Sequence, residues 1–166
     1  MNVKDRINLF NKIRDIPYSI SVGGEENVDC SAKVEMLKKE LDLKSRSIIC
    51  EFRWEDLKLP KEILQAYHED PEYHELLEVY IPERQKFVIV DPTWDSGLKP
   101  IFSINEWDGL NDTKIAVPEK KVYSPEESKK IIEKVNNPEE IKKYLDRNGD
   151  FFVRLNNYFK KIRNSR

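Results

Sequence analysis

The feature that most constrains the fold is a pair of apolar segments joined by a short polar turn. Residues 73–81 and 86–90 are rich in β-branched and aromatic side chains, and the sequence Pro-Glu-Arg-Gln separates them. This pattern predicts a β-hairpin in which the numbers of paired residues sum to about 167. The register of such a hairpin decides which side chains of its two strands share a face.

Two helices are predicted before the hairpin. Apolar side chains recur at three- and four-residue steps over residues 3–13, and Pro17 ends this first helix. A turn is predicted at Gly23-Gly24. The second helix is predicted to run from Cys30 to about residue 43, with Asp29 as its N-cap.

The segments on either side of the hairpin predict further strands and loops. Residues 47–54 are apolar and β-branched enough to form a strand, and residues 55–72 predict a loop with one helical turn. Beyond the hairpin, the irregular segment 92–123 has two candidate edge strands, at residues 101–102 and 114–117.

The C-terminal part predicts three helices. Ser124-Pro125-Glu126-Glu127 is a capping box, and Asn137-Pro138-Glu139-Glu140 repeats its pattern. Asn148-Gly149 is predicted to end the middle helix and Asp150 to cap the last one. The basic residues at 160–166 are interpreted as a solvated helix end.

Composition limits the classes of protein that the chain can belong to. Its 166 residues fit one domain, from residue 1 to residue 166, with a core that needs no disulfide or metal. The net charge of -2 argues against a nucleic-acid or membrane-surface binder, and no apolar run is long enough to span a membrane. Two cysteines without a secretory signal predict a reducing, cytoplasmic location.

Three residues could form a nucleophilic site. Cys30 lies at a helix start, where unpaired N–H groups and the helix dipole favour a thiolate. The predicted register places Asp91 opposite Leu76 and diagonally next to His74, so the carboxylate can hold the imidazole. The alternative interpretation is a buried cysteine beside a surface His–Asp pair.

The order of these residues, and the sequence around them, resemble the transglutaminase-like superfamily, whose members have a papain-like Cys-His-Asp triad. The resemblance covers roughly residues 16–95, and the C-terminal extension from about residue 124 to 166 lies outside it. It rests on residues 29–37 (Asp-Cys-Ser-Ala-Lys-Val-Glu-Met-Leu), 43–49 (Leu-Lys-Ser-Arg-Ser-Ile-Ile), 73–80 (Tyr-His-Glu-Leu-Leu-Glu-Val-Tyr) and 87–93 (Phe-Val-Ile-Val-Asp-Pro-Thr).

The resemblance implies an α+β fold in which the nucleophile helix packs on an antiparallel sheet. It also implies that Cys30 is the nucleophile, His74 the general base and Asp91 the residue that orients the base. The chain departs from the family pattern at two positions. Asp29 stands before the cysteine in place of the usual glycine, and Leu76 stands two residues after the histidine in place of the usual aromatic residue. No Gln precedes the cysteine to form an oxyanion hole, so Tyr18 and the backbone N–H of Cys30 are the candidates for that role.

Other residues have two interpretations each. Trp54 and Trp94 flank the strands of the triad, where they either wall an acyl cleft or pack in the core. Cys50 shares its strand parity with apolar residues, which predicts a core thiol. A zinc site from Cys30, His68 and His74 is an alternative, but these residues lack the close spacing of zinc ligands.

The sequence therefore predicts a cytoplasmic cysteine hydrolase, a protease or amidase that acts on a peptide or protein amide without a cofactor. Nothing in the residues selects water over an amine as the acyl acceptor, so a transglutaminase-like acyltransferase is retained as well. The alternative is a non-catalytic module that binds a peptide or a partner protein. The sequence does not predict an oligomeric state.

Overall fold

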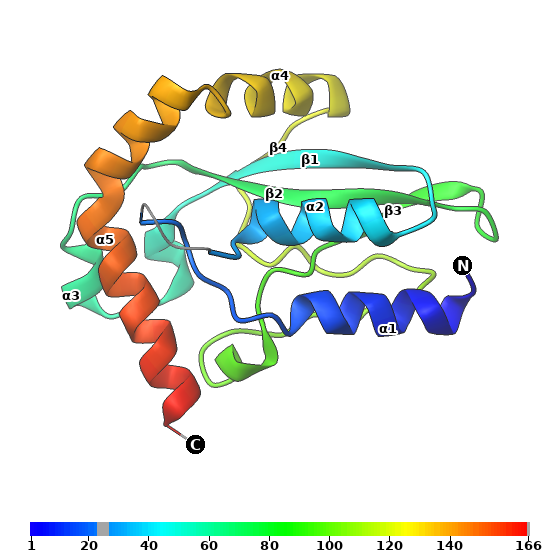
Figure 1. Ribbon diagram of the computed structural model, residues 1–166, viewed down its shortest axis with the longest axis horizontal. Coiled ribbons are helices and arrows are strands. Elements are labelled where there is room, and N and C mark those ends of the chain that lie inside the picture. The colour runs from blue at the N-terminus through cyan, green and yellow to red at the C-terminus, as the bar shows by residue number, and fades with distance from the viewer. Residues whose placement is uncertain (23–26, 166) are drawn as a thin grey trace.

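The computed structural model describes residues 1–22 and 27–165. The predicted Gly23-Gly24 turn lies outside the described residues. The described chain is an α+β protein whose helices surround one antiparallel sheet (Figure 1). None of its described helices is both long and apolar enough to cross a membrane.

The sheet has four strands in the order β3-β2-β1-β4. These are β1 (Ser45–Phe52), β2 (Glu72–Ile81), β3 (Lys86–Val90) and the short β4 (Lys121–Val122). The predicted hairpin is confirmed in β2 and β3. Its register is confirmed too, because Leu77 pairs with Val90 and Tyr80 with Phe87, and both pairs sum to 167.

The two N-terminal helices form a layer on the sheet. Helices α1 (Val3–Arg14) and α2 (Cys30–Glu40) lie side by side, and α2 packs against β2 (Figure 1). Both helices are confirmed, although α2 ends earlier than predicted. Their apolar faces meet the far halves of β2 and β3 in one core cluster, which includes Phe10, Ile13, Val34, Leu37, Leu77, Val79 and Val88.

Strand β2 buries one face near its start and the opposite face further along. Glu72, His74 and Leu76 are buried near its start, whereas Leu77 and Val79 are buried further on. Because successive side chains of a strand point to opposite faces, the two halves pack into different cores. His74 therefore belongs to a part of the sheet that α1 does not cover.

Of the two C-terminal helices, α5 contributes to this second core. Helix α4 (Pro125–Val135) begins at the predicted capping box and packs along β1, and α5 (Pro138–Asn164) crosses one end of the sheet (Figure 1). Helix α5 places four fully buried side chains against the core residues Tyr18, Trp54 and Trp94. These four are Phe151, Phe152, Leu155 and Phe159.

The predicted helix end at Asn148-Gly149 is wrong, because both residues lie inside α5, as does the predicted cap Asp150. The side chain of Asn148 is buried, donates to the carbonyl of Tyr144 and accepts from the backbone N–H of Glu69. The long-range hydrogen bond to Glu69 satisfies this buried amide inside the helix, at a residue type that is more common at helix ends.

The predicted edge strands at residues 101–102 and 114–117 are also wrong, since neither segment is a strand. The sheet edge at β1 is instead paired with β4. The edge at β3 is met by single hydrogen bonds: Thr113 donates its N–H to Ile89, and Ile89 donates to the side chain of Asp112. Because the N–H of Ile89 is taken by a side chain and not by a neighbouring main chain, the repeating backbone hydrogen bonds of a paired strand do not form at this edge.

The predicted loop at 55–72 contains two short helical segments, Trp54–Leu57 and Lys61–Leu64, and a further turn spans Ser96–Leu98.

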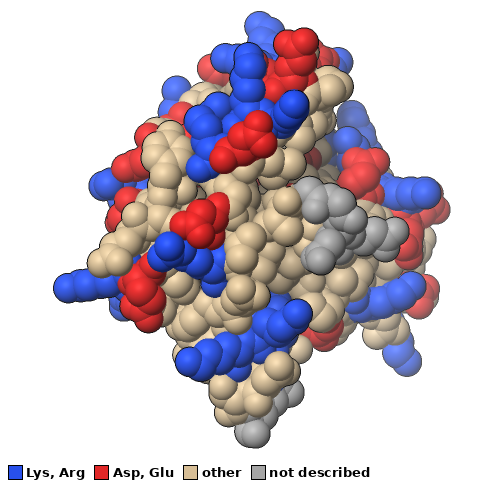
Figure 2. Space-filling view, turned by 60° about the vertical axis from the view of Figure 1, so that its left-hand side comes forward, with Lys and Arg blue, Asp and Glu red and all other residues tan. Residues whose placement is uncertain are grey.

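On the face of the molecule drawn in Figure 2, acidic and basic side chains are interspersed around an uncharged area.

Candidate functional site

Cys30 is the first residue of α2. Asp29 is the N-cap, as predicted, and its Oδ1 accepts the N–H of Ala32 at 3.0 Å. The thiol is partly exposed, in contrast to Cys50, which is fully buried in the core as predicted. The local sequence thus places a reachable thiol at the positive end of a helix dipole.

His74 and Asp91 form the centre of the site. Nε2 of His74 lies 2.7 Å from Oδ2 of Asp91, and both side chains are almost completely buried. Burial disfavours the imidazolium, but the negative charge of Asp91, its hydrogen bond and the contribution of Cys30 together outweigh burial and raise the pKa of His74 above its usual value. Burial likewise opposes the ionisation of Asp91, but the charge of His74 and the donors around it lower its pKa.

Two further residues fix the Asp91 carboxylate. Oδ1 accepts both the backbone N–H and the hydroxyl of Thr93, at 3.1 and 2.6 Å, while Oδ2 also accepts the N–H of Ala116 at 2.8 Å. Thr93 stands in the Asp-Pro-Thr sequence that carried the resemblance, so its position was a usable signal. Ala116 has no such signal, because its contribution is made by the main chain.

Cys30 completes the arrangement from the other side of the imidazole. Because Asp91 occupies Nε2, Nδ1 is the ring nitrogen that remains for the thiol. A hydrogen bond and the charge of Cys30 act on the pKa of His74 in the same direction as Asp91 does. The structure therefore brings the three predicted residues together, with His74 between the other two.

These residues open into a cavity of about 670 Å³. Tyr18, Trp54 and Trp94 line it together with Cys30 and His74. The two tryptophans are also nearly inaccessible, so the prediction that they pack in the core is confirmed.

Tyr18 lies where its side chain can reach the site. Its ring is buried edge-on to Trp94, and burial, followed by the charge of Cys30, raises the pKa of its hydroxyl well above the usual value. Its main chain is held by an ion pair that was not predicted: Asp95 accepts the N–H of Tyr18, while Arg163 bonds both Asp95 and the carbonyl of Tyr18. The prediction of a solvated basic tail is therefore wrong for Arg163.

Lys33 is a second residue that the sequence did not reveal. One turn after Cys30, it is fully buried, and Nζ donates to the carbonyls of Arg14 and Thr93 at 2.7 and 2.9 Å. Burial lowers the pKa of its ammonium to about 8. The side chain therefore joins α2 to the end of α1 and to the residue that holds Asp91.

A Lys33→Met variant should be less stable than the wild type by about 1–3 kcal/mol, because two carbonyls lose their donor. Since the folded-state pKa of Lys33 is lowered to about 8, the unfolded state binds more protons between that value and its usual value near 10.4. The free energy of unfolding of the wild type therefore increases as pH rises across this range. The difference in this free energy between the wild type and Lys33→Met should increase with it. Urea unfolding at several pH values measures this difference. Lys39→Met, at an exposed position of α2, should show neither effect.

No group of three or more metal-binding side chains occurs in the part of the chain that the structure describes. His68 instead contacts the carbonyl of Ala66 and the carboxylate of Glu55, at 2.8 and 2.9 Å. These contacts place its imidazole in a different network from that of Cys30 and His74.

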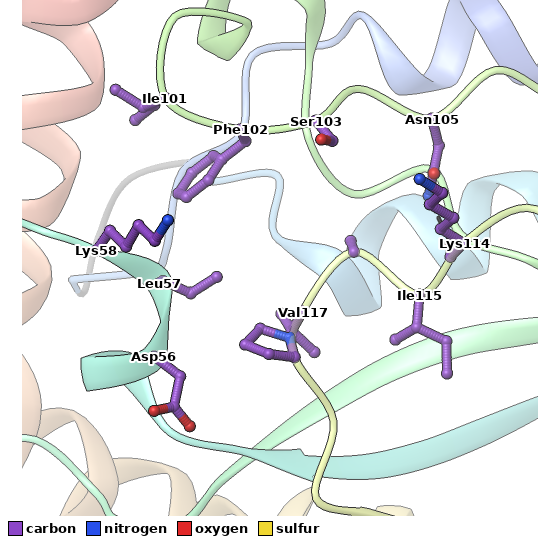
Figure 3. A pocket seen from close by; sticks show the side chains of 12 residues that line it. Asp56, Leu57, Lys58, Ile101, Phe102, Ser103, Asn105, Lys114, Ile115 and Val117 are labelled. Carbon is purple, nitrogen blue, oxygen red and sulfur yellow. Dashed lines mark hydrogen bonds between the residues drawn. The ribbon is translucent and has the colours of Figure 1, made fainter.

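A second cavity of about 330 Å³ is lined in part by residues 114–118, the segment that includes Ala116; Figure 3 labels Lys114, Ile115 and Val117 of this segment. Neither cysteine nor histidine is among the described residues that line it. Ala116 borders this cavity, donates its N–H to Asp91 and accepts the indole N–H of Trp94 at 2.7 Å. Through these two hydrogen bonds, the main chain at Ala116 holds the carboxylate of Asp91 and the ring of Trp94 in place.

The chain matches no protein-family model, no curated protein and no solved structure.

Proposed function

We propose that this chain is a cysteine-dependent enzyme that cleaves amide bonds, a peptidase or amidase with a papain-like, transglutaminase-like core. The observation that carries the proposal is the position of His74, which bonds Asp91 through Nε2 and is close enough to Cys30 for the thiol to act on its pKa. The packing of α2 against β2 supports the same assignment. The substrate is a peptide or protein amide.

The chemistry follows from this geometry. The thiolate of Cys30 attacks the carbonyl carbon of the amide, and the C–N bond breaks as His74 gives its proton to the leaving amine. Water then attacks the thioester, with His74 taking a proton from it, and the acid and the free thiol are released. The backbone N–H of Cys30 and the hydroxyl of Tyr18 are the candidates to stabilise the oxyanion.

The negative charge next to the nucleophile is compatible with this role. Burial raises the pKa of Asp29, while its side chain accepts the N–H of Ala32 at the start of α2. A carboxylate whose oxygen accepts a helix N–H has part of its negative charge offset there, so it opposes the thiolate less than an exposed carboxylate would.

The proposal is tested by the rate of alkylation of Cys30 with iodoacetamide as a function of pH. In the wild type we expect Cys30 to react at neutral pH much faster than an ordinary free thiol does, and to lose this advantage in His74→Ala. Peptide mapping separates Cys30 from Cys50. His68→Ala, which changes the other of the two histidines, is the matched control and should react like the wild type.

Alkylation that follows an ordinary thiol titration in both the wild type and His74→Ala would overturn the enzyme assignment. The fold would then be better explained as a module that binds a peptide or a partner without cleaving it.

A further inference from the structure

The hydroxyl of Tyr18 has no hydrogen-bond partner among the residues that the structure describes, although the main chain of this residue is bonded on both sides. The side chain is only 4% exposed and lines the cavity at Cys30. Burial, followed by the charge of Cys30, raises the pKa of the hydroxyl, so it is a neutral donor close to the thiol. Buried polar groups normally have a partner, and an acceptor bound in the cavity would supply one.

The main chain of Tyr18 is held by two side chains from distant parts of the sequence. Oδ2 of Asp95 accepts its N–H at 2.9 Å, and Nη2 of Arg163 donates to its carbonyl at 2.8 Å. Arg163 also bonds both oxygens of Asp95, at 2.6 Å from Nη2 and at 3.1 Å from Nε. Two bonds between a guanidinium and a carboxylate fix the relative orientation of both groups. The pair therefore fixes the backbone position from which the ring of Tyr18 extends.

The surroundings of this ion pair leave it little freedom. Only 19% of the Arg163 side chain and 4% of the Asp95 side chain are exposed. Gly97 donates its N–H to Oδ1 of Asp95 at 3.1 Å. A Cβ at Gly97 would lie 2.8 Å from Cγ of Arg163 and 2.8 Å from Oδ1 of Asp95, so a larger residue would displace the pair. A buried ion pair is favourable only when its geometry is well satisfied, and these contacts satisfy it.

The same helix holds the chain two residues further on. Asn156 of α5 accepts the N–H of Ile20 at 2.9 Å and donates to its carbonyl at 2.8 Å. Asn156, Phe159 and Arg163 follow each other at three- and four-residue steps, so they lie on one face of α5. The ring of Phe159 packs against that of Tyr18. This face of α5 thus fixes the main chain and the ring of Tyr18 and leaves its hydroxyl free to donate.

Building on the proposed function, we infer that Arg163 and Asp95 are positioning residues, which hold the hydroxyl of Tyr18 where it donates to the oxyanion formed at Cys30. Tyr18 is then the group that touches the reacting oxygen, and the ion pair acts only through it. A donor stabilises an oxyanion most when its position is fixed before the reaction begins. Helix α5 thereby completes a site whose triad lies on other elements.

Two reactions of Cys30 separate this role from the integrity of the triad. With p-nitrophenyl acetate, the thiolate attacks the carbonyl carbon, the carbonyl oxygen becomes an oxyanion, and p-nitrophenolate leaves as the acetyl thioester forms. With iodoacetamide, the thiolate displaces iodide from a methylene carbon, and no oxyanion forms. The ratio of the acylation rate to the alkylation rate therefore reports oxyanion stabilisation and cancels changes in the amount of thiolate. Cys30→Ala gives the background of both reactions.

Tyr18→Phe should lower this ratio by about a hundredfold, the effect of losing one oxyanion donor. Because the lost hydroxyl has no partner in the protein, the fold should be retained. Arg163→Met should lower the ratio by about tenfold to a hundredfold, since a misplaced group loses much of its effect. Arg154→Met removes the same charge from the same helix, where Arg154 bonds Asp150 and the carbonyl of Glu62, and should leave the ratio unchanged.

The double variant tests whether Arg163 acts through the hydroxyl. If it does, Arg163→Met should lower the ratio little or not at all in the Tyr18→Phe protein, because the donor that it positions is already absent. An equal effect in both backgrounds would make Arg163 a general support of the fold and overturn the inference. Arg163→Lys keeps the charge beside Asp95 but lacks the fork of the guanidinium, so it replaces Arg163→Met in this comparison if that variant does not fold.

The remaining outcomes separate this inference from the proposed function. A Tyr18→Phe protein with the wild-type ratio would overturn the inference alone, since Cys30 would still react rapidly with iodoacetamide. A wild-type Cys30 that reacts with iodoacetamide no faster than a free thiol would overturn the proposed function and, with it, this inference.

Discussion

An Asp91→Asn variant should lose most of the thiolate reactivity of Cys30 at neutral pH, by about one to two orders of magnitude, because a free thiol of pKa ~8.5 is only a few per cent ionised there. Burial opposes the charged form of His74, and the charge of Asp91 with its hydrogen bond makes the largest contribution that offsets burial and raises the pKa of His74. Without that charge, a fully buried imidazole is neutral at pH 7. The thiol then has no imidazolium to stabilise its ionised form.

The amide cannot replace the carboxylate in the hydrogen-bond network. Oδ2 of Asp91 accepts from His74 and from the N–H of Ala116, and Oδ1 accepts twice from Thr93. An asparagine NH₂ group must face one of these two sets of donors, whichever way the amide is turned. Leaving a buried donor unpaired costs about 1–3 kcal/mol, so the variant should also be less stable.

The pH dependence of this stability difference has a defined sign. The folded-state pKa of Asp91 is lowered, so its contribution is present above the unfolded pKa and is lost as pH falls through the folded value. The folded-state pKa of His74 is raised, so its contribution is present below the unfolded pKa and is lost as pH rises through the folded value. The difference between the wild type and Asp91→Asn should therefore be largest between the two unfolded-state pKa values, roughly pH 4 to 6.5, and should fall outside that range.

Iodoacetamide kinetics and urea unfolding across pH measure both effects. Asp42→Asn, at an exposed residue that follows α2, is the matched control and should behave like the wild type. If Asp91→Asn retained wild-type alkylation rates at pH 7, Asp91 would not be the group that holds His74 in its reactive state.

The parts of the fold that the sequence predicted are those with short-range causes. Period-two alternation and a four-residue tip set the register of β2 and β3, and that register brings Asp91 next to His74. Asp29 caps α2 because its side chain reaches an N–H three residues away. These interactions depend on neighbours in the chain, so a pattern can reveal them.

The unpredicted parts depend on partners far away in the sequence. Lys33 has the sequence context of a surface lysine, and only the approach of Arg14 and Thr93 makes it a buried donor. The N–H of Ala116 could belong to any residue type. Asn148 continues a helix because its side chain bonds Glu69 across the fold, and nothing in the local sequence indicates this.

The largest effect on stability is expected from Phe159→Ala, which should lower the free energy of unfolding by about 3–5 kcal/mol. Phe159 is in α5 and is fully buried, with ring centroids 6.0, 5.9 and 5.7 Å from those of Tyr18, Trp94 and Phe102. Three rings on three different segments cannot all move into the space that one missing ring leaves. The loss therefore includes a cavity as well as the buried apolar area.

Urea unfolding monitored by circular dichroism measures this loss. Val153→Ala is the control, since Val153 lies in the same helix but is 44% exposed, and its change should stay within about 0.5 kcal/mol. A loss below about 1 kcal/mol for Phe159→Ala would show that α5 is only attached to the surface of the core.

The expected result has a consequence for the site, because Phe159 supports the wall that Tyr18 and Trp94 present to Cys30. One turn further along α5, Arg163 bonds the carbonyl of Tyr18. The variant should therefore also weaken the dependence of Cys30 alkylation on pH, even in the fraction that remains folded.

Residues 16–95 contain the triad, but the walls around it depend on a helix that the family resemblance does not include. Removing the C-terminal helices should consequently abolish both the fold and the reactivity, whereas an independent core would retain both.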